Sequence, residues 1–308
     1  MKTKSTLLKV GIQGGKASFH DSAADLYLTQ YLAKCLGKNS DSNSNNEFFT
    51  HDTVEFDTFR GLCEALAKEE LDLAIMAIEN SIAGSILPNY HLLESFQFTI
   101  LGEIYLRIIM NLMALPGQKI EDLQFVQSHP MALLQCLDFL ARYPFIKAVE
   151  ASDTADSAKF IKENKLKNYG AIASQKAAAL YGLDLLAESI ETNKQNFTRF
   201  LVLCKKPLRT RPHFNFQQLL REPDKSSLRF ELPHRPGALS AVLLRFAQSK
   251  INMTKIQSLP ILGKPYEYSF HVDVEWENKK EYAHCLKDLL PLTQNLLVLG
   301  EYPKGPKY

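Results

Sequence analysis

The densest group of polar side chains in this sequence follows an apolar run. In the string LDLAIMAIENSIAGSI, the run from Leu71 to Ile78 ends at Glu79, Asn80 and Ser81. An apolar strand that is buried on both faces presents polar residues at its carboxyl end, which is where open α/β sheets bind ligands. The same spacing fits Asn80 and Ser81 as caps of a helix that begins near Gly84. The sequence therefore indicates either a ligand site or a helix cap here.

A second group has the same layout. A predicted strand at 123–128 leads to Ser128 and Pro130, and then to a helix that carries Gln135. Pro130 suits a first helical turn, and Ser128 is placed to cap it, which leaves backbone N–H groups that favour an anion. Capping alone is the competing interpretation. Ser174 begins another predicted helix in the same way.

A hydroxyl and a permanent positive charge stand side by side near the start of the predicted strand 197–204. Thr198 precedes Arg199 in the string NFTRF, and the planar fork of arginine suits a substrate carboxylate. In a regular strand the two side chains point to opposite faces, so simple pleating cannot bring both into one cleft. A bend in the strand and a structural role for Arg199 are both left open.

Several other kinds of site are not indicated. The glycine-rich segment 13–18 lacks the spacing of dinucleotide-binding and P-loop motifs, the eight histidines include no H-E-x-x-H, and no G-x-S-x-G occurs. The sequence therefore predicts no nucleotide site and no catalytic zinc, and it does not single out a serine-hydrolase triad.

The composition is that of a folded, nearly neutral chain. The 308 residues are 45% hydrophobic, and 36 basic against 34 acidic residues give a formal net charge of +2. Such a chain can bury a large core, and it has no global field that would hold polyanions or an anionic membrane. Two or three domains are expected at this length.

Cysteine usage and hydropathy indicate a cellular location. The five cysteines form no C-x-x-C pair, the N-terminus carries no signal-peptide pattern, and no apolar run is long enough to span a membrane. These features predict a cytoplasmic protein that binds neither membrane nor nucleic acid. The short basic run at Arg209, Arg211 and His213 is interpreted as a solvated surface rather than a nucleic-acid contact.

Residues 1–205 alternate short aliphatic runs with amphipathic runs, which predicts a mostly parallel sheet covered by helices. Strands are expected at 7–13, 47–53, 71–78, 98–115 in two pieces, 123–128, 146–151, 169–173, 186–190 and 197–204. Helices are expected at 18–36, 57–70, 84–95, 130–142, 154–164 and 174–182, and the polar tract 37–47 is expected to be a surface loop. Because one sheet rarely holds so many strands, we expect two α/β lobes around a ligand cleft, as in periplasmic binding proteins.

A second, smaller domain is expected after a proline-containing linker at 206–225. Residues 226–308 predict, in order, strand 227–232, helix 236–249, strands 252–259 and 266–275, helix 279–290 and strand 295–302. This βαββαβ order is typical of an α+β ferredoxin-like domain, in which two helices cover one face of a four-stranded antiparallel sheet. Alternation from Tyr266 to Val274 predicts a half-buried strand.

Four strings in this order resemble the prephenate dehydratase family across residues 7–204: AIENSIAGSI, SHPMALLQC, AIASQKAAALYGL and NFTRFLVL. The tail resembles the regulatory ACT domain of that family, with PGAL at 236–239 and INMTKIQSLP at 251–260. No extra helical segment of a fused chorismate mutase is expected. The resemblance implies a monofunctional enzyme of phenylalanine biosynthesis with a C-terminal ACT domain.

The implied reaction removes carbon dioxide and hydroxide from prephenate to give phenylpyruvate, without a cofactor or a metal. The resemblance gives Thr198 the role of a hydrogen-bond donor to the leaving hydroxyl, and it makes three neighbours part of the catalytic group: Glu79, Asn80 and Ser81. The residues that it assigns to substrate binding are Ser128, Gln135, Ser174, Arg199 and Phe200. Helix N-termini are expected to help offset the charge of the dianionic substrate.

The resemblance also implies inhibition by phenylalanine at the ACT domain of a homodimer or homotetramer. The expected effector-binding residues are Pro236, Gly237, Ala238, Leu239, Asn252, Gln257 and Ser258. Gln257 and Leu259 stand where the family has an acid and a base, which predicts an altered strength of inhibition. Met131 replaces a glutamine at the rim of the cleft.

Two other functions fit the same sequence. Arogenate dehydratase performs the same chemistry on a substrate whose side chain is an amino acid rather than a keto acid. A non-catalytic ligand-binding protein would also have two α/β lobes around a cleft. The retained Thr198 and the absence of a signal-peptide pattern favour an enzyme over the binding protein.

Overall fold

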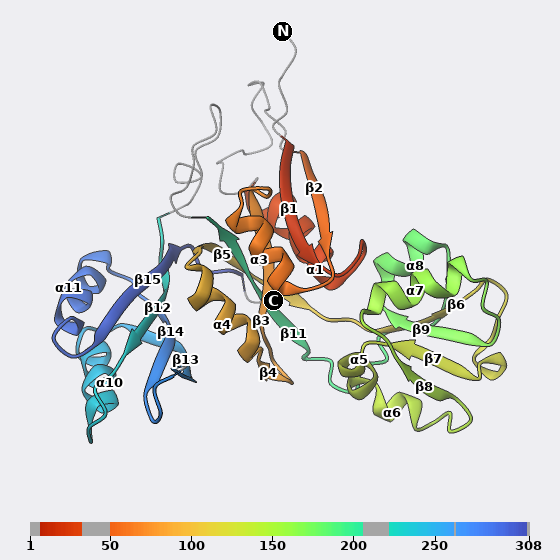
Figure 1. The fold of residues 1–308 in the computed structure, drawn as a ribbon. Helices are drawn as coiled ribbons and strands as arrows, with labels where there is room; N and C mark the ends of the chain where they lie inside the picture. Colours follow the sequence, from red (N-terminus) through yellow and green to blue (C-terminus); the bar gives the residue numbers. More distant parts are fainter. Residues whose placement is uncertain (1–6, 33–49, 206–221, 262, 307–308) are drawn as a thin grey trace, which may run out of the picture.

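The computed structural model describes residues 7–32, 50–205, 222–261 and 263–306. Figure 1 shows three parts in a row, with the C-terminal domain, a first lobe in the middle and a second lobe at the other end. The expected loop at 37–47 lies outside the described residues, and so does most of the linker, including Arg209, Arg211 and His213. Among the described residues, no helix is both long enough and apolar enough to cross a lipid bilayer.

The first lobe is a mixed sheet with the strand order β2-β1-β3-β11-β5, to which β4 adds a short pairing with β3. Its strands are β1 (Leu7–Gln13), β2 (Thr50–Phe56), β3 (Leu73–Asn80), β4 (Gly84–Ser85), β5 (Thr99–Arg107) and β11 (Phe197–Cys204). Its helices are α1 (Phe19–Leu26), the π-helical turn η1 (Tyr27–Leu32), α3 (Phe59–Ala67) and α4 (Leu87–Phe96). The prediction of a mostly parallel sheet is wrong, because β11 returns from the second lobe and runs antiparallel to both β3 and β5.

The apolar run before Asn80 forms the central strand β3, and both of its faces are covered as predicted. Ala74, Met76 and Ile78 pack with residues of α3 and α4. Leu73 and Ile75, on the opposite face, pack with residues of α1. A strand that is buried in this way delivers its polar carboxyl end to the edge of the lobe.

The second lobe is a smaller mixed sheet with the order β10-β6-β9-β7-β8. Its strands are β6 (Asn111–Ala114), β7 (Phe125–Ser128), β8 (Lys147–Glu150), β9 (Tyr169–Ala173) and β10 (Asp184–Ala187). Its helices are η2 (Ile120–Asp122), α5 (Pro130–Gln135), α6 (Leu137–Leu140), α7 (Thr154–Glu163) and α8 (Gln175–Tyr181). The chain crosses between the lobes twice, and the backbone N–H of Ile108 donates to the carbonyl of Asn196 (2.8 Å) where the two crossings meet.

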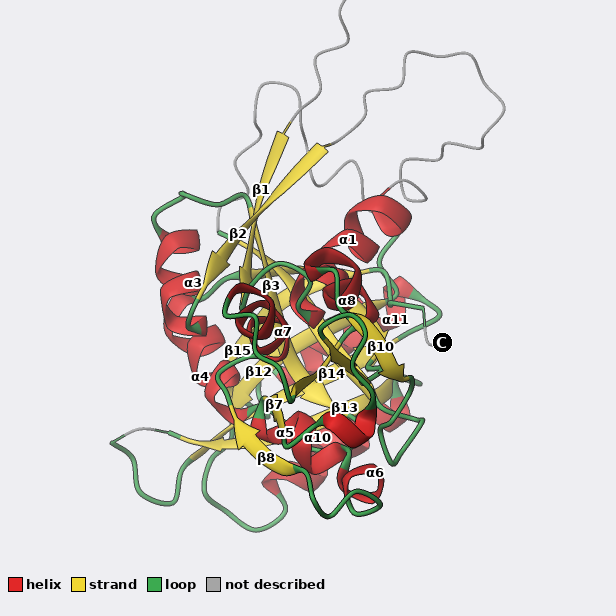
Figure 2. Ribbon diagram, turned by 90° about the vertical axis from the view of Figure 1, so that its right-hand side faces the viewer, coloured by secondary structure: helices red, strands yellow, loops and turns green. Residues whose placement is uncertain are grey.

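The C-terminal domain has the predicted βαββαβ order, with antiparallel strands arranged as β13-β14-β12-β15. Its elements are β12 (Lys225–Glu231), α10 (Ala238–Gln248), β13 (Asn252–Pro260), β14 (Tyr268–Glu275), α11 (Lys279–Leu289) and β15 (Gln294–Tyr302). Figure 2 views the molecule from the side of the second lobe, with the C-terminal sheet behind it. Helices α10 and α11 cover one face of this sheet through an apolar cluster that includes Phe246 and Cys285.

The other face of the C-terminal sheet is also buried, which the sequence did not predict. Ser269, His271 and Asp273 alternate with the apolar residues of β14, and all three are buried. They are covered because this face packs on the first lobe. Leu299 and Tyr302 of β15 belong to the same apolar cluster as residues of α3 and α4. The interpretation of β14 as a half-buried strand is therefore wrong.

Candidate active site

A cleft of about 590 Å³ lies between the two lobes. Strand ends, helix starts and the first interlobe crossing, at Ile108 and Met110, contribute to its wall. The apolar lining includes Phe19, Phe59, Ile86, Ile108, Met110 and Phe200. The polar lining includes Gln13, His20, Asp57, Asn80, Ser85, His129, Gln135, Asp153 and Thr198. The predicted cleft is therefore present, and four predicted site residues line it: Asn80, Gln135, Thr198 and Phe200.

Asn80 and Thr198 face each other across the pairing of β3 with β11. The side-chain oxygen of Asn80 accepts the backbone N–H groups of Ile82 (3.0 Å) and Ala83 (2.9 Å), which settles the orientation of its amide. Its nitrogen therefore points at the hydroxyl of Thr198 and donates to it over 3.0 Å. Asn80 thus holds a turn rather than capping α4, whose N-cap is Ile86 and lacks a side-chain bond.

The direction of this bond decides what the hydroxyl of Thr198 can do. A hydroxyl has one donor and two acceptor positions, and Asn80 occupies one acceptor. Among the described residues, no protein acceptor takes the hydroxyl hydrogen of Thr198. Because Thr198 lines the cleft, that hydrogen is available to a bound molecule.

A chain of amide hydrogen bonds connects this pair to the second lobe. The amide of Asn80 also donates to Asn196 (2.8 Å), whose own amide donates to Gln135 on α5 (2.8 Å). Asn196 is fully buried and lies in the crossing that leads into β11. The sequence interpretation did not assign it a role, although it begins the string NFTRF.

One end of the cleft is aromatic. The ring of His20 lies 5.3 Å from that of Phe59 and 5.0 Å from that of Phe200, centroid to centroid. Burial lowers the pKa of His20 to about 3, and its Nε2 accepts the backbone N–H of Ala77 over 3.4 Å. His20 is therefore a neutral ring in an apolar wall. No motif had singled it out.

Four helices of at least eight residues begin at the cleft: α1, α3, α4 and α7. The N-caps of α1, α3 and α7 are Ser18, Thr58 and Asp153, each of which accepts a backbone N–H of its own helix. Helix N-termini carry partial positive charge and favour bound anions. In the part of the chain that the structure describes, neither lysine nor arginine lines the cleft.

Asp153 stands out among the charged lining residues. Its Oδ1 accepts the N–H groups of Ala155 and Asp156 (2.7 and 3.1 Å), while its Oδ2 faces Gly14. A Cβ on Gly14 would lie 2.8 Å from that oxygen, and φ is +86° there, so glycine is required. Burial raises the pKa of Asp153, and the charge of Asp156 adds to this.

Four other predicted site residues lie outside the cleft. Ser128 is buried and donates to the carbonyl of Ile172 (2.6 Å), so the prediction that it caps α5 is wrong; the N-cap is His129. Ser174 does cap α8, and it donates to Ala17 (2.8 Å). Ser81 bonds the backbone of Gln195 and Phe197 (2.9 Å each). Glu79 forms an ion pair with Lys255 of the C-terminal domain (2.8 Å).

Arg199 points away from the cleft, as simple pleating predicts. Its Nε donates to Glu103 (2.7 Å), and its guanidinium also contacts Asp273 and the hydroxyl of Tyr302. The side chain is 4% exposed. The assignment of Arg199 to substrate binding does not agree with this placement, because both neighbouring carboxylates already hold the guanidinium on the opposite face of β11.

The predicted effector residues lie on the surface of the C-terminal domain. Pro236 and Gly237 are exposed in the turn before α10, and Gly237 adopts a φ of +80° as its N-cap. Asn252 and Ser258 are exposed on β13, while Gln257 is half-buried and donates to the carbonyl of Ser258 (2.9 Å).

Comparison with known sequences connects this geometry to one family. The family model for prephenate dehydratase matches residues 10–208. Arogenate dehydratase 2 of Petunia hybrida is 34% identical over an alignment that covers 98% of this chain and 73% of that protein. Arogenate dehydratase/prephenate dehydratase 2, chloroplastic, of Arabidopsis thaliana is 36% identical, with 87% and 70% covered.

Solved structures agree over nearly the whole chain. GqqA, described as a novel type of quorum quenching acylase, superposes with a TM-score of 0.79 at 26% identity, covering 97% of this chain and 98% of that chain. Prephenate dehydratase from Arthrobacter aurescens in complex with L-Phe gives a TM-score of 0.76 at 25% identity, covering 96% and 90%. The family model, these relatives and the four sequence motifs agree, and the chain therefore belongs to the prephenate dehydratase family.

Proposed function

We propose that this protein converts prephenate to phenylpyruvate, carbon dioxide and water in phenylalanine biosynthesis. Residues 1–205 are the catalytic region, 206–225 the linker and 226–308 a regulatory ACT-type domain. The observation that carries the proposal is the hydroxyl of Thr198, which Asn80 orients so that its hydrogen faces the interlobe cleft.

In the reaction, the bond from the ring to its carboxylate breaks and carbon dioxide leaves. The electron pair that remains moves into the ring and expels the hydroxyl from the opposite ring carbon as hydroxide, so that the ring becomes aromatic; the hydroxide takes up a proton from solvent and leaves as water. The enzyme must stabilise negative charge on the departing oxygen, and Thr198 supplies a hydrogen bond there. The amide of Asn80 donates to Thr198 Oγ1 (3.0 Å) and stabilises the charge that this oxygen gains.

The substrate carries two carboxylates and an apolar ring. The N-termini of α1, α3 and α7 supply partial positive charge for the carboxylates. Phe59, Phe200 and neutral His20 supply an apolar wall for the ring. Gln135 belongs to the amide chain that ends at Thr198, so it joins the second lobe to the site.

Arogenate is the second candidate substrate, and one observation favours it. Its side chain bears an ammonium group, and the charged side chains of the described cleft lining include the carboxylates Asp57 and Asp153 but no lysine or arginine. Asp153 Oδ2 has no hydrogen-bond donor in the part of the chain that the structure describes. A carboxylate in that position suits an ammonium group. The names of the two plant relatives also include arogenate dehydratase.

Prephenate and arogenate offered separately test the function. Ultraviolet absorbance detects phenylpyruvate from prephenate, and chromatography detects phenylalanine from arogenate. Product from prephenate supports the first candidate, and product from arogenate alone replaces it with the second. Ligand binding without either product contradicts both and favours the non-catalytic binding protein.

Phenylalanine is the proposed effector of the C-terminal domain. The Arthrobacter aurescens relative was solved with L-Phe, and the turn at Pro236 and Gly237 precedes a helix N-terminus that suits a carboxylate. Strand β13 is an edge of its sheet, and Ile256 on it is 43% exposed, which supports assembly into a homodimer or homotetramer. Calorimetry and small-angle scattering with and without phenylalanine test both points; no binding heat, no scattering change and no inhibition would leave only a dimerisation role.

A further inference from the structure

Two successive cross-strand pairs of the first lobe face opposite sides of its sheet. On β3 and β11, Asn80 pairs with Thr198, and Glu79 pairs with Arg199. Asn80 and Thr198 line the cleft, whereas Glu79 and Arg199 contact the C-terminal domain. Asn80 and Thr198 in the cleft are therefore each adjacent in sequence to a residue, Glu79 or Arg199, that forms an ion pair with the C-terminal domain.

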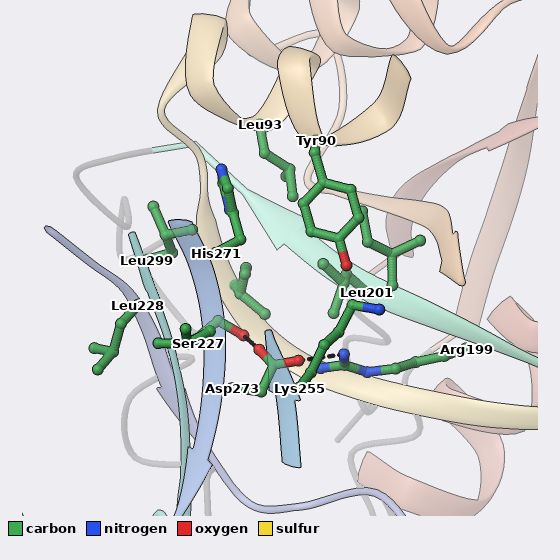
Figure 3. A pocket seen from close by; sticks show the side chains of 13 residues that line it. Tyr90, Leu93, Arg199, Leu201, Ser227, Leu228, Lys255, His271, Asp273 and Leu299 are labelled. Carbon is green, nitrogen blue, oxygen red and sulfur yellow. Dashed lines mark hydrogen bonds and ion pairs between the residues drawn. The ribbon is translucent and has the colours of Figure 1, made fainter. Parts of the chain in front are cut away.

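The first of these contacts is the ion pair between Arg199 and Asp273 on β14. Figure 3 shows the guanidinium beside Asp273, and Ser227 of β12 donates to the same carboxylate. Burial on its own raises the pKa of Asp273, but the charge of Arg199 and its hydrogen bond lower that pKa below its ordinary value. Asp273 is therefore ionised, and the contact joins two full charges inside the protein.

The second contact is made by Lys255 on β13. Its Nζ lies 2.8 Å from Glu79 Oε1 and donates to Ser85 Oγ over 2.9 Å. The ammonium also lies 5.8 Å from the centre of the Tyr90 ring, and Figure 3 shows the two side chains together. Because Ser85 lines the cleft, Lys255 reaches both the cleft wall and the neighbour of Asn80.

Lys255 and Asp273 are themselves a cross-strand pair, on β13 and β14. The cross-strand pair Lys255–Asp273 of the C-terminal sheet therefore forms ion pairs with the cross-strand pair Glu79–Arg199 of the first-lobe sheet. The cavity between them measures about 10 Å³, which is room for one water molecule at most. Separating the sheets would break the Arg199–Asp273 and Glu79–Lys255 ion pairs and leave the buried Arg199 with Glu103 as its remaining carboxylate. Breaking a buried ion pair is unfavourable, so we expect the two sheets to move together at this point.

Resting on the proposed function, we propose that Lys255 and Arg199 are positioning residues that hold the Asn80–Thr198 pair in its working geometry and transmit movement of the C-terminal sheet to it. Strand β13 also carries Asn252, Gln257 and Ser258, three of the predicted effector residues. A ligand that moves β13 therefore displaces Lys255 and, through it, Glu79, the residue before Asn80. Movement of β14 displaces Asp273 and, through it, Arg199, the residue after Thr198. Regulation then needs no ligand in the cleft.

Lys255→Met tests the proposal because it removes the charge and keeps most of the side chain. We expect kcat to fall about tenfold, KM to change less than about twofold, and inhibition by phenylalanine to weaken about tenfold. Lys255→Arg should restore most of each value. The matched control is Arg229→Met, which removes another ion pair between the same domains, with Glu94 on α4 (3.2 Å). Glu94 has no chain neighbour in the cleft lining, so kcat and inhibition should stay within about twofold.

Hydrogen exchange gives a readout that does not depend on activity. The backbone amides of residues 196–201 should exchange about tenfold faster in Lys255→Met than in the wild type. Their exchange rates should be unchanged in Arg229→Met. Unchanged exchange and unchanged kcat in Lys255→Met overturn the proposal. An equal fall of kcat in both variants also overturns it, because any loosening of the interface would then suffice. Absence of turnover in the wild type contradicts the proposed function but not the positioning roles. The hydrogen-exchange rates of residues 196–201 then test whether Lys255 holds the Asn80–Thr198 pair.

Discussion

The hydroxyl of Thr198 accepts a hydrogen bond from the amide of Asn80, at 3.0 Å. This direction follows from the two backbone N–H groups that occupy the oxygen of Asn80. The hydrogen of Thr198 is thereby left for the cleft. The chemistry proposed for this protein depends on that arrangement, and the first two predictions test it.

Thr198→Ala should lower kcat about 100-fold or more, because a positioned donor to a leaving group contributes about that factor. Thr198→Ser should retain part of the activity, since it keeps the hydroxyl. Steady-state kinetics measure both, with circular dichroism as the control for folding. Near-normal turnover of a folded alanine variant would remove Thr198 from the mechanism.

Asn80→Asp should lower kcat about 100-fold although it changes the shape of the side chain very little. A carboxylate accepts hydrogen bonds and does not donate them, so the hydrogen of Thr198 would turn from the cleft toward it. Asn193→Asp is the control, because Asn193 is exposed and, within the described part of the chain, its side chain bonds only the local backbone N–H of Gln195. Equal kinetics of the two variants would contradict the role of Asn80.

Asp153→Asn should discriminate between the two candidate substrates. Asparagine is as good an N-cap as aspartate, so α7 keeps its cap while the cleft loses a negative charge. We expect kcat/KM for arogenate to fall about tenfold and that for prephenate to stay level or rise. Glu163→Gln, which removes a charge from the exposed far end of the same helix, outside the cleft lining, should alter neither. A parallel change for both substrates would show that Asp153 does not recognise the ammonium group.

Glu94→Gln should destabilise the protein in a pH-dependent manner. Burial tends to raise the pKa of Glu94, but hydrogen bonds from His271 and Ser269 and nearby charge lower it from 4.5 to about 2. A carboxyl whose folded pKa is lowered stabilises the fold above its unfolded pKa, and this contribution is lost as the pH falls through the folded pKa. The shift corresponds to about 3 kcal/mol, and screening at this partly exposed group reduces the expected loss to about 1–2 kcal/mol.

Urea unfolding at several pH values between 7 and 3 measures this loss. The deficit of Glu94→Gln should be full at pH 5 and above, and should shrink as the pH falls below 4.5. Glu64→Gln, at an exposed position on α3, should have little effect at any pH. A deficit that does not vary with pH would mean that Glu94 acts through packing and not through its charge.

Treatment with EDTA should leave activity unchanged. The proposed reaction needs a donor to the leaving oxygen and sites for two carboxylates, and Thr198 and the helix N-termini supply these. Activity after dialysis against the chelator measures the outcome. A loss that a divalent cation restores would overturn the prediction and require a metal in the mechanism.

The sequence was sufficient for the local structure because hydrophobic periodicity is a local property. Strands at 7–13, 169–173 and 197–204 and the division of 98–115 into two strands agree with the structure. The buried run at Leu73–Ile78 ends at the cleft with Asn80, as expected for a strand that is buried on both faces and carries polar residues at its carboxyl end. Helix ends were less predictable: the helix expected at 130–142 divides at Cys136, whose φ of −110° and ψ of +17° end α5.

Only the tertiary structure decided which partners the polar residues have. Arg199 bonds Glu103, Asp273 and Tyr302, which lie 96, 74 and 103 residues away along the chain. Alternation showed that its side chain opposes that of Thr198, but no local pattern shows which surface covers that face. The polar face of the C-terminal sheet is buried for the same reason: burying a charge is favourable only where a distant segment supplies its counter-charge, and the fold brings that segment there.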